Sequence, residues 1–166
     1  MKRLLAVLGS ALFLVIAPGT IAGVIPWWIS GWRMQTPFTW WFPLRVLGGL
    51  LIAAGAAVLL ESFARFALQG LGTPAPVFPT RILVVTGLYQ YVRNPMYVAV
   101  LSLVVGQGLV LGNMAVLGYA VILWLGFHVF VLAYEEPTLR ATYGPEYERF
   151  CANVRRWIPR LSAWHN

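Results

Sequence analysis

The sequence predicts an all-α integral membrane protein with about four transmembrane helices, the last two a helical hairpin, plus a cytoplasmic interfacial C-terminal helix. Of its 166 residues, 60% are hydrophobic and only 10% are charged, whereas a soluble domain carries about 25% charged residues. Several uncharged runs are long enough to cross a bilayer, and the eight Trp residues suit its two interfaces. We therefore expect one membrane domain over residues 1–166 and no separate soluble module.

The first two spans are predicted over residues 4–25 and 44–65. No charge occurs from Leu4 to Trp32, and roughly 20 residues suffice for one crossing. The chain start also resembles a signal peptide, but the uncharged run outlasts a signal core of about 7–15 residues, which favours retention over cleavage. The second span is rich in small residues that suit close helix packing, namely Gly48, Gly49, Ala53, Ala54, Gly55, Ala56 and Ala57.

The helical hairpin is predicted from one long apolar region, residues 94–134. This region contains no charged residue, and at about 1.5 Å per residue it is long enough for two crossings. Gly112 and Asn113 lie near its middle and favour a turn. We therefore expect spans over residues 95–111 and 114–134, followed by a cytoplasmic tail over residues 135–166.

The positive charges predict the orientation. With four spans, both termini lie on one side, and all Lys and Arg residues except Arg33 and Arg45 fall on that side. Cytoplasmic segments carry the excess of Lys and Arg, so we expect both termini in the cytoplasm and the chain in an inner or cytoplasmic membrane. A group of Trp residues then belongs to the outer interface as anchors, namely Trp27, Trp28, Trp32, Trp40 and Trp41.

Composition also limits the partners and the chemistry. The formal net charge of +7 suits either nucleic acid or an anionic membrane surface, and the apolar spans favour membrane lipids over nucleic acid. Cys151 is the single cysteine, which rules out an internal disulfide. No cluster of Cys and His provides metal ligands, so we expect no metal.

Polar residues before the third span predict an anion-binding end. Asn94 is a favoured helix N-cap and Pro95 a favoured first helical residue. A helix that begins there directs unpaired N–H groups at the preceding loop and attracts anions. Arg93 adds a fork of donors suited to carboxylate or phosphate. The alternative is that Arg93 merely follows the positive charge preference of its side.

Two carboxylates, Glu135 and Glu136, close the fourth span in a chain with few other acidic residues. They suit a cationic ligand group, and the alternative is ion pairing with Arg140 or Arg93. Pro137 is expected to break or kink the helix at this point. His128, about two turns earlier, is a candidate for lining an acceptor pocket, or else a packed core residue.

These residues together resemble the integral membrane S-adenosylmethionine-dependent methyltransferases, which include isoprenylcysteine carboxyl methyltransferases and phospholipid N-methyltransferases. The resemblance covers about residues 63–160. Its core is Gly87-x-Tyr89-x-x-x-Arg93-Asn94-Pro95-x-Tyr97, Gly106, Glu135-Glu136-x-x-Leu139, Tyr143-Gly144-x-x-Tyr147 and Arg156-Trp-Ile-Pro159. Many relatives have His at the position of Asn94, so an imidazole base is impossible here. Other features of the chain resemble both subfamilies, and the subfamily stays open.

The resemblance implies S-adenosylmethionine as methyl donor and a lipophilic acceptor that enters from the bilayer. By position it implies a cofactor-binding role for Arg93, Asn94, Pro95, Tyr97, Gly106, Glu135, Glu136 and Tyr147. Arg156, and with less support Arg155, become acceptor-side candidates. Methyl transfer to a carboxylate needs no base, whereas an amine must lose a proton, which Glu135 or Glu136 is placed to accept. The candidate catalytic residues are therefore Glu135, Glu136 and Arg156.

Two other functions compete with methyl transfer. An NAD(P)H-dependent membrane reductase of related fold would use a larger cofactor. A short chain offers fewer residues to line a binding site of that size. A non-catalytic small membrane protein would use the Glu pair and the Arg-Asn-Pro-x-Tyr segment for structure alone. The sequence identifies neither the acceptor, whether carboxyl, amine or thiol, nor the oligomeric state.

Overall fold

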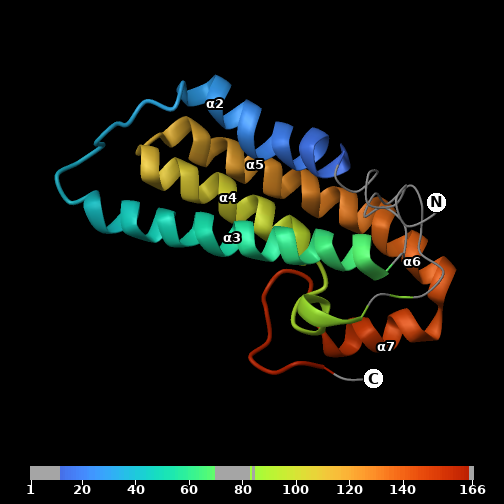
Figure 1. Cartoon of the computed structure of the whole chain (residues 1–166). Coiled ribbons are helices and arrows are strands. Elements are labelled where there is room, and N and C mark those ends of the chain that lie inside the picture. The colour runs from blue at the N-terminus through green and yellow to red at the C-terminus, as the bar shows by residue number, and fades with distance from the viewer. Residues whose placement is uncertain (1–11, 70–82, 84, 165–166) are drawn as a thin grey trace.

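The computed structural model describes residues 12–69, 83 and 85–164, and all regular structure in this part of the chain is helical (Figure 1). Residues 12–30 form one helical segment that contains the π-helical turn η1 and ends as α2. The bounds are η1 Thr20–Val24, α2 Ile25–Ser30, α3 Phe42–Gln69, η2 Gly87–Gln90, α4 Pro95–Leu111, α5 Met114–Phe130, η3 Val131–Glu135, α6 Glu136–Tyr143 and α7 Pro145–Asn153. The predicted all-helical fold class is confirmed for the described residues.

Within the described residues, three helical segments are long and apolar enough to cross a membrane, namely Leu12–Ser30, Phe42–Arg65 and Met114–Tyr143. Helix α4 is also apolar, but it has only 17 residues. The first segment corrects the expected end at residue 25, because its helix continues to Ser30 and stops at Gly31, whose φ of 57° is the left-handed conformation that ends helices. The expected start at residue 4 lies outside the described residues.

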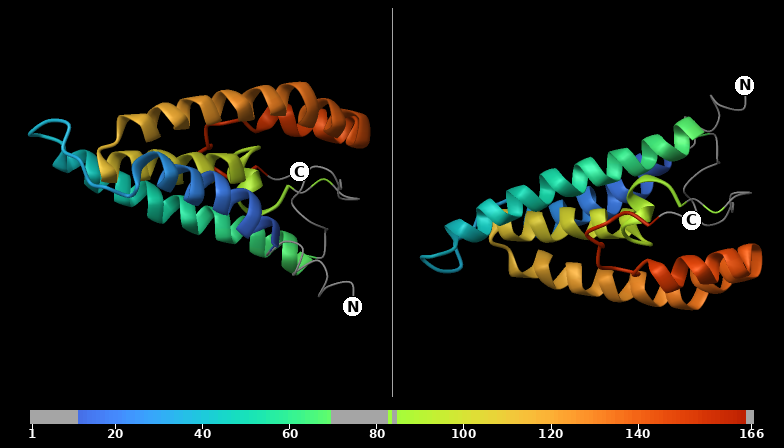
Figure 2. Two further views of the ribbon diagram at one scale, coloured as in Figure 1. Left: turned by 90° about the horizontal axis from the view of Figure 1, so that it is seen from above. Right: turned by 90° about the horizontal axis from the view of Figure 1, so that it is seen from below.

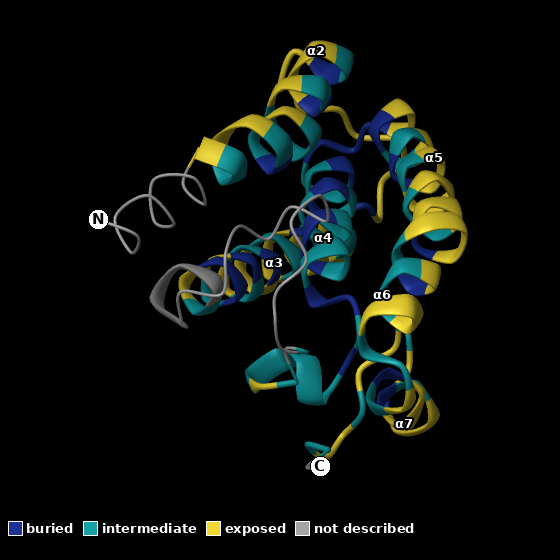
Figure 3. Ribbon diagram, turned by 90° about the vertical axis from the view of Figure 1, so that its right-hand side faces the viewer, coloured by how far each residue is buried: buried dark blue, intermediate teal, exposed yellow. Residues whose placement is uncertain are grey.

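Helix α4 lies at the centre of the bundle, where the helical segment 12–30, α3 and α5 surround it (Figure 3). Its most extensive contact is with α3. Buried residues occur along the whole of α4, whereas in α5 only Val116 and Ala120 are buried. The exposed apolar side chains of α5, such as Val121, Ile122 and Val129, are the surface expected to face lipid in a membrane.

Glycine residues allow α3 and α4 to pack closely, as the small residues of the second span predict. A Cβ atom added to Gly48 would lie 2.7 Å from the carbonyl oxygen of Gly106, and one added to Gly55 would lie 2.9 Å from that of Ala99. Gly49 points elsewhere, because a Cβ atom there would meet nothing within 4 Å. The two helix backbones are therefore in contact along one face of α3.

Replacing Gly48 with alanine is expected to lower the free energy of unfolding by about 1–3 kcal/mol, the usual cost of overpacking a tight contact. The two helices must separate to admit the methyl group. Unfolding by SDS in mixed micelles, followed by circular dichroism, measures the change. The matched control, Gly49→Ala, is expected to be neutral or stabilising because alanine has the higher helix propensity. Equal losses for both variants would contradict the packing.

The turn between α4 and α5 is held by backbone geometry and by the preceding loop. Gly112 has a φ of 66°, and the side chain of Asn113 caps α5 by accepting a hydrogen bond from the Val116 N–H over 3.1 Å. The Gln35 N–H donates to the Leu111 carbonyl over 2.7 Å. The loop 31–41 and this turn therefore form one end of the bundle (Figure 1).

Helix α5 continues through η3 into α6, so of the two outcomes expected for Pro137, a break or a kink, the break does not occur. Pro137 lies in the first turn of α6, and the backbone around it, from Phe130 to Glu136, keeps right-handed helical angles. Proline cannot donate the usual backbone hydrogen bond. The π-helical turn η3 directly precedes it and provides a different pattern of backbone hydrogen bonds at this point.

The opposite end of the bundle, which we call the polar end, carries η2, α6, α7 and the C-terminal segment, residues 154–164. Figure 2 shows that α5 and α6 diverge from α3 and α4 towards this end, with η2 and the C-terminal segment between them. The C-terminal segment is tied to residues 90–93 by three backbone hydrogen bonds: Arg93 N–H to Arg155, Arg160 N–H to Tyr91, and Trp164 N–H to Gln90. The C-terminal segment is thus held against the loop before α4 at the polar end.

Candidate functional site

A buried carboxylate, Glu136, is the centre of the polar end. Its side chain is 3% exposed and accepts hydrogen bonds from three arginines. Arg156 binds it with two nitrogens, Nε at 2.6 Å and Nη2 at 3.1 Å. Arg93 Nη1 lies 3.1 Å and Arg140 Nη2 3.5 Å away. This carboxylate therefore ties together α6, the loop before α4 and the C-terminal segment with charge-assisted hydrogen bonds.

Arg93 is the most enclosed of these arginines, with a side chain 12% exposed. Its Nη1 also donates to Cys151 Sγ over 2.8 Å. Its Nε is buried and has no hydrogen-bond partner among the described residues. An unpaired buried donor is costly, so this atom is available to an acceptor group that is added to the site.

Asn94 stands at the N-cap position of α4, but its side chain does not cap the helix. Its amide Nδ2 instead donates to the Arg156 carbonyl over 3.2 Å. The capping role expected from the residue type is therefore wrong, because a partner from the C-terminal segment holds the amide. Pro95 is buried and occupies the first turn of α4 as predicted.

Glu135 has a different environment from Glu136. Its Oε2 accepts a hydrogen bond from the Tyr97 hydroxyl over 2.8 Å. Within residues 12–69, 83 and 85–164, no arginine or lysine forms an ion pair with it. The adjacent carboxylates thus have different partners: arginines neutralise Glu136, and a tyrosine hydroxyl binds Glu135.

Aromatic rings surround the Tyr97 hydroxyl. The ring of Tyr97 lies 4.7 Å from that of Phe127 and 6.4 Å from that of Trp157. The indole N–H of Trp157 donates to His128 Nδ1 over 3.1 Å, and the His128 ring stacks on Trp124 at 5.4 Å. Because aromatic faces attract cations, these rings and Glu135 together form an environment suited to a positively charged group.

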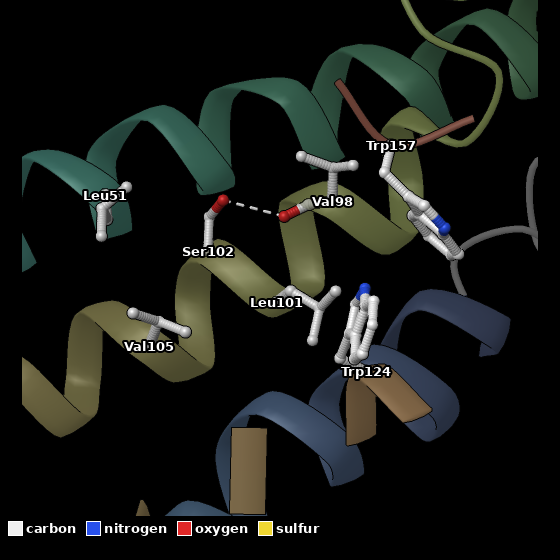
Figure 4. A pocket seen from close by; sticks show the side chains of 7 residues that line it. All are labelled: Leu51, Val98, Leu101, Ser102, Val105, Trp124 and Trp157. Atoms are coloured by element: carbon white, nitrogen blue, oxygen red, sulfur yellow. Dashed lines mark hydrogen bonds between the residues drawn. The ribbon is translucent and has the colours of Figure 1, made fainter. Parts of the chain in front are cut away.

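An apolar pocket of about 310 Å³ adjoins these rings (Figure 4). It is formed by α3, α4, α5 and the C-terminal segment. Its one polar side chain, Ser102, donates its hydroxyl hydrogen to the Val98 carbonyl over 2.8 Å and so presents little polarity. The lining residues are Leu51, Val98, Leu101, Ser102, Val105, Trp124 and Trp157. The pocket therefore suits a hydrocarbon group.

Ionisation at the polar end follows burial and pairing. The hydrogen bond to the Glu136 carboxylate raises the pKa of Arg156, so its guanidinium stays charged. Burial, with smaller contributions from the Glu135 and Glu61 carboxylates, raises the pKa of Tyr89. Burial also raises the pKa of Tyr147, whose side chain packs in a buried cluster with Phe150 and Val154. Both tyrosines therefore stay neutral near pH 7 and act through their hydroxyl groups alone.

Residues 44–146 of the chain match the family that is described as phospholipid methyltransferase. The chain belongs to this family. The family match extends from α3 into the start of α7, so it includes Arg93, Tyr97 and the Glu pair and stops before Arg156.

This phospholipid methyltransferase family member is also similar to the protein-S-isoprenylcysteine O-methyltransferase of Schizosaccharomyces pombe (strain 972 / ATCC 24843). The two are 34% identical over 81 residues, which are 48% of this chain. The chain thus matches 34% of the length of that relative. No solved structure matches the chain.

The structure brings most of the sequence-predicted site residues together, but not all. Arg93, Asn94, Pro95, Tyr97, Glu135, Glu136, Tyr147, Arg156 and His128 lie at the polar end or beside the pocket. Gly106 lies apart, in the contact with Gly48 on α3. The side chain of Arg155 is exposed, and only its backbone carbonyl takes part, by accepting from the Arg93 N–H over 2.9 Å.

Several residues of the site were not predicted as such, among them Phe127, whose ring lies 4.7 Å from that of Tyr97. Trp157 and Trp124 line the pocket, and Cys151 contacts Arg93. Trp157 follows Arg156 within the closing motif of the resemblance, a signal that was present but unused. Trp124 and Cys151 carry no comparable signal, because their partners lie far away along the chain.

Proposed function

We propose that this protein is a methyltransferase that moves a methyl group from S-adenosylmethionine to a lipophilic acceptor at the polar end of the helices. One observation carries the proposal. A cluster of arginines around the buried Glu136, to which the loop before α4, α6 and the C-terminal segment contribute, adjoins an apolar pocket. Family membership supports the same reaction, and the name of the similar yeast protein supports a lipid-modified acceptor.

The residues of the polar end fit the chemical groups of this donor. The buried, unpaired Nε of Arg93 suits its carboxylate. Glu135, with no arginine partner in the described part of the chain, suits its ammonium group, and the rings of Tyr97 and Phe127 suit its sulfonium or adenine. When bound, the donor supplies an electrophilic methyl group on a positively charged sulfur.

The chain's own residues then have three tasks. The Glu136 carboxylate fixes the position of Arg156 next to the pocket through two hydrogen bonds. There the guanidinium of Arg156 orients an anionic acceptor. The aromatic rings exclude water from the reacting groups. For an amine acceptor, the Glu135 carboxylate is placed to accept the proton that leaves, whereas a carboxylate acceptor requires no base.

We further propose four membrane crossings with both termini in the cytoplasm. Helix α4 of 17 residues spans roughly 26 Å at 1.5 Å per residue, close to the ~30 Å hydrocarbon core. Seven of the described arginines lie at the polar end or in the chain after α5, namely Arg65, Arg93, Arg140, Arg149, Arg155, Arg156 and Arg160. Arg33 and Arg45 lie at the opposite end. This asymmetry supports a cytoplasmic polar end.

Binding of the donor product tests the proposal. S-adenosylhomocysteine is expected to stabilise the purified protein in detergent against thermal unfolding, by about 2.7 kcal/mol at a concentration one hundred times its Kd. NADPH at the same concentration is the control and is expected to have no effect. Stabilisation by NADPH alone would favour a reductase, and stabilisation by neither ligand would contradict both enzymes. Labelled donor with total membrane lipid then identifies the acceptor.

A further inference from the structure

In the C-terminal segment, the neighbouring residues Arg156 and Trp157 have different surroundings, the polar cluster and the apolar pocket. On one side of them the Arg155 carbonyl accepts from the Arg93 N–H over 2.9 Å, and on the other the Arg160 N–H donates to the Tyr91 carbonyl over 2.9 Å. Between these fixed points, Arg156 binds Glu136. Trp157, the next residue, lines the apolar pocket. The boundary between the polar cluster and the pocket thus falls between two adjacent residues.

The indole of Trp157 occupies this boundary and is held there. Its N–H donates to His128 Nδ1 over 3.1 Å, and its ring lies 6.4 Å from the ring of Tyr97. Figure 4 shows the indole at the Val98 end of the pocket, across from Trp124. The hydrogen bond fixes the orientation of a large, rigid side chain, which His128 on α5 therefore positions.

The other end of the pocket lies near a tight helix contact. From Val98 to Val105 the lining of α4 covers roughly 10 Å at 1.5 Å per residue. One residue further, α3 and α4 meet at Gly48 and Gly106, where an added Cβ atom would lie 2.7 Å from a backbone oxygen. The pocket therefore extends from Trp157, beside the polar cluster, towards this helix contact.

We propose that Trp157, positioned by His128, determines which apolar chains this enzyme accepts. The inference rests on the proposed methyltransferase function and adds a specificity-determining residue to it. The acceptor passes its hydrocarbon chain beside the indole, and its reactive group stays at Arg156. Because the indole borders one end of the pocket and the α3–α4 contact lies beyond the other, we expect chains of one length to fit the pocket best.

Binding of unreactive probes tests the proposal without any methyl transfer. Two series are used, the methyl esters of N-acetyl-S-prenylcysteines (geranyl, farnesyl and geranylgeranyl) and alkylphosphocholines of increasing chain length. Each probe is already methylated and cannot accept a further methyl group. Its Kd is measured by thermal stabilisation of the full-length protein. In the native protein we expect one preferred length. Trp157→Ala is expected to shift the preference to longer or bulkier chains, by at least about tenfold in the ratio of the Kd values.

Two further variants keep the test decisive if Trp157→Ala does not fold. Val105→Phe fills the far end and is expected to shift the preference to shorter chains. Trp28→Ala removes an indole that is 81% exposed at the other end of the bundle and is the matched control with an unchanged preference. The same length profile in the native protein, Trp157→Ala and Val105→Phe would overturn the proposal. So would a native protein that binds no probe of either series.

The role of His128 has its own readout. Trp157→Phe keeps a ring but loses the N–H donor, and His128→Leu removes the acceptor. Each is expected to weaken the length preference by a similar factor, and the double variant is expected to add nothing further. His128→Gln, which retains an acceptor, is expected to recover part of the preference. A native length profile in His128→Leu would show that the histidine does not position the indole.

These measurements separate the inference from the proposed function. Absence of methyl transfer to any lipid, together with a length preference that depends on Trp157, would leave a lipid-binding pocket and reject the enzyme. Methyl transfer with a length preference that ignores Trp157 would retain the enzyme and reject this residue as its determinant.

Discussion

Glu136→Ala is expected to abolish methyl transfer and donor binding and to destabilise the protein by about 3–5 kcal/mol, the usual cost of removing one partner from a buried ion pair. The Glu136 carboxylate is 3% exposed and neutralises Arg93 and Arg156, whose side chains are 12% and 26% exposed. Without it, two enclosed positive charges repel each other. We expect the C-terminal segment to detach from α6 as a result.

The measurements for this variant are the free energy of unfolding in SDS, the Kd of S-adenosylhomocysteine and the rate of methyl transfer. Glu136→Gln retains the shape of the side chain but not its charge, and it is expected to lose activity with a smaller loss of stability. Glu148→Ala is the matched control, because Glu148 is 59% exposed and pairs with Arg140 at the surface, where ion pairs contribute little. Native donor affinity and turnover in Glu136→Ala would reject the assignment of this site.

The helical segments were predictable because their signal is local. Uncharged runs give the spans, and Gly112 with Asn113 gives the turn, where the structure finds the end of α4 and the cap of α5. The first span was placed with less accuracy. Its continuation to Ser30 depends on Gly31, a C-terminal signal that the charge-based estimate of the span does not use.

The clustering of polar residues at one end was also predictable, but their pairing was predictable only in part: ion pairing with Arg140 or Arg93 was one of two alternatives, and the pair with Arg156 was not foreseen. The residues that Glu136 binds are 43, 20 and 4 positions away along the chain, and sequence alone places only the nearest of them beside it. For the same reason the amide of Asn94 was expected to cap α4, although it donates to a carbonyl 62 residues away. Residue type indicates what a side chain is able to bind, and packing decides what it does bind.

The two glutamates illustrate this difference most clearly. Their sequence environment is nearly the same, and both a cationic ligand and ion pairing with arginine were open for the pair. Successive residues of a helix point in directions about 100° apart, so they contact different elements. Glu136 meets the arginines, and Glu135 meets Tyr97 on α4. Ion pairing is thus confirmed for Glu136, and a cationic ligand at Glu135 stays a proposal.

The second large effect is expected at Arg156, and its neighbour supplies the control. Arg156→Ala removes two hydrogen bonds to the Glu136 carboxylate, and a hydrogen bond to a charged group is worth about 1.5–3 kcal/mol. Under the proposed function Arg156 makes an interaction of this size with the acceptor in the transition state, and its loss is expected to lower kcat/KM roughly ten- to hundredfold. Arg155→Ala is expected to stay within about twofold of the native enzyme, because the exposed side chain of Arg155 makes no such contact and its backbone carbonyl is retained.

Arg156→Lys refines this prediction. Lysine keeps the positive charge but lacks the planar fork that binds both carboxylate oxygens, so it is expected to recover little of the activity. The readout is kcat/KM with the acceptor found by methyl labelling, and circular dichroism checks that the fold is intact. Full recovery by lysine would mean that charge alone matters at this position, and equal losses in Arg155→Ala and Arg156→Ala would mean that the tail acts only by attraction to lipid headgroups. Because the two arginines are adjacent and alike in charge, only the contact with Glu136 predicts that their substitutions differ.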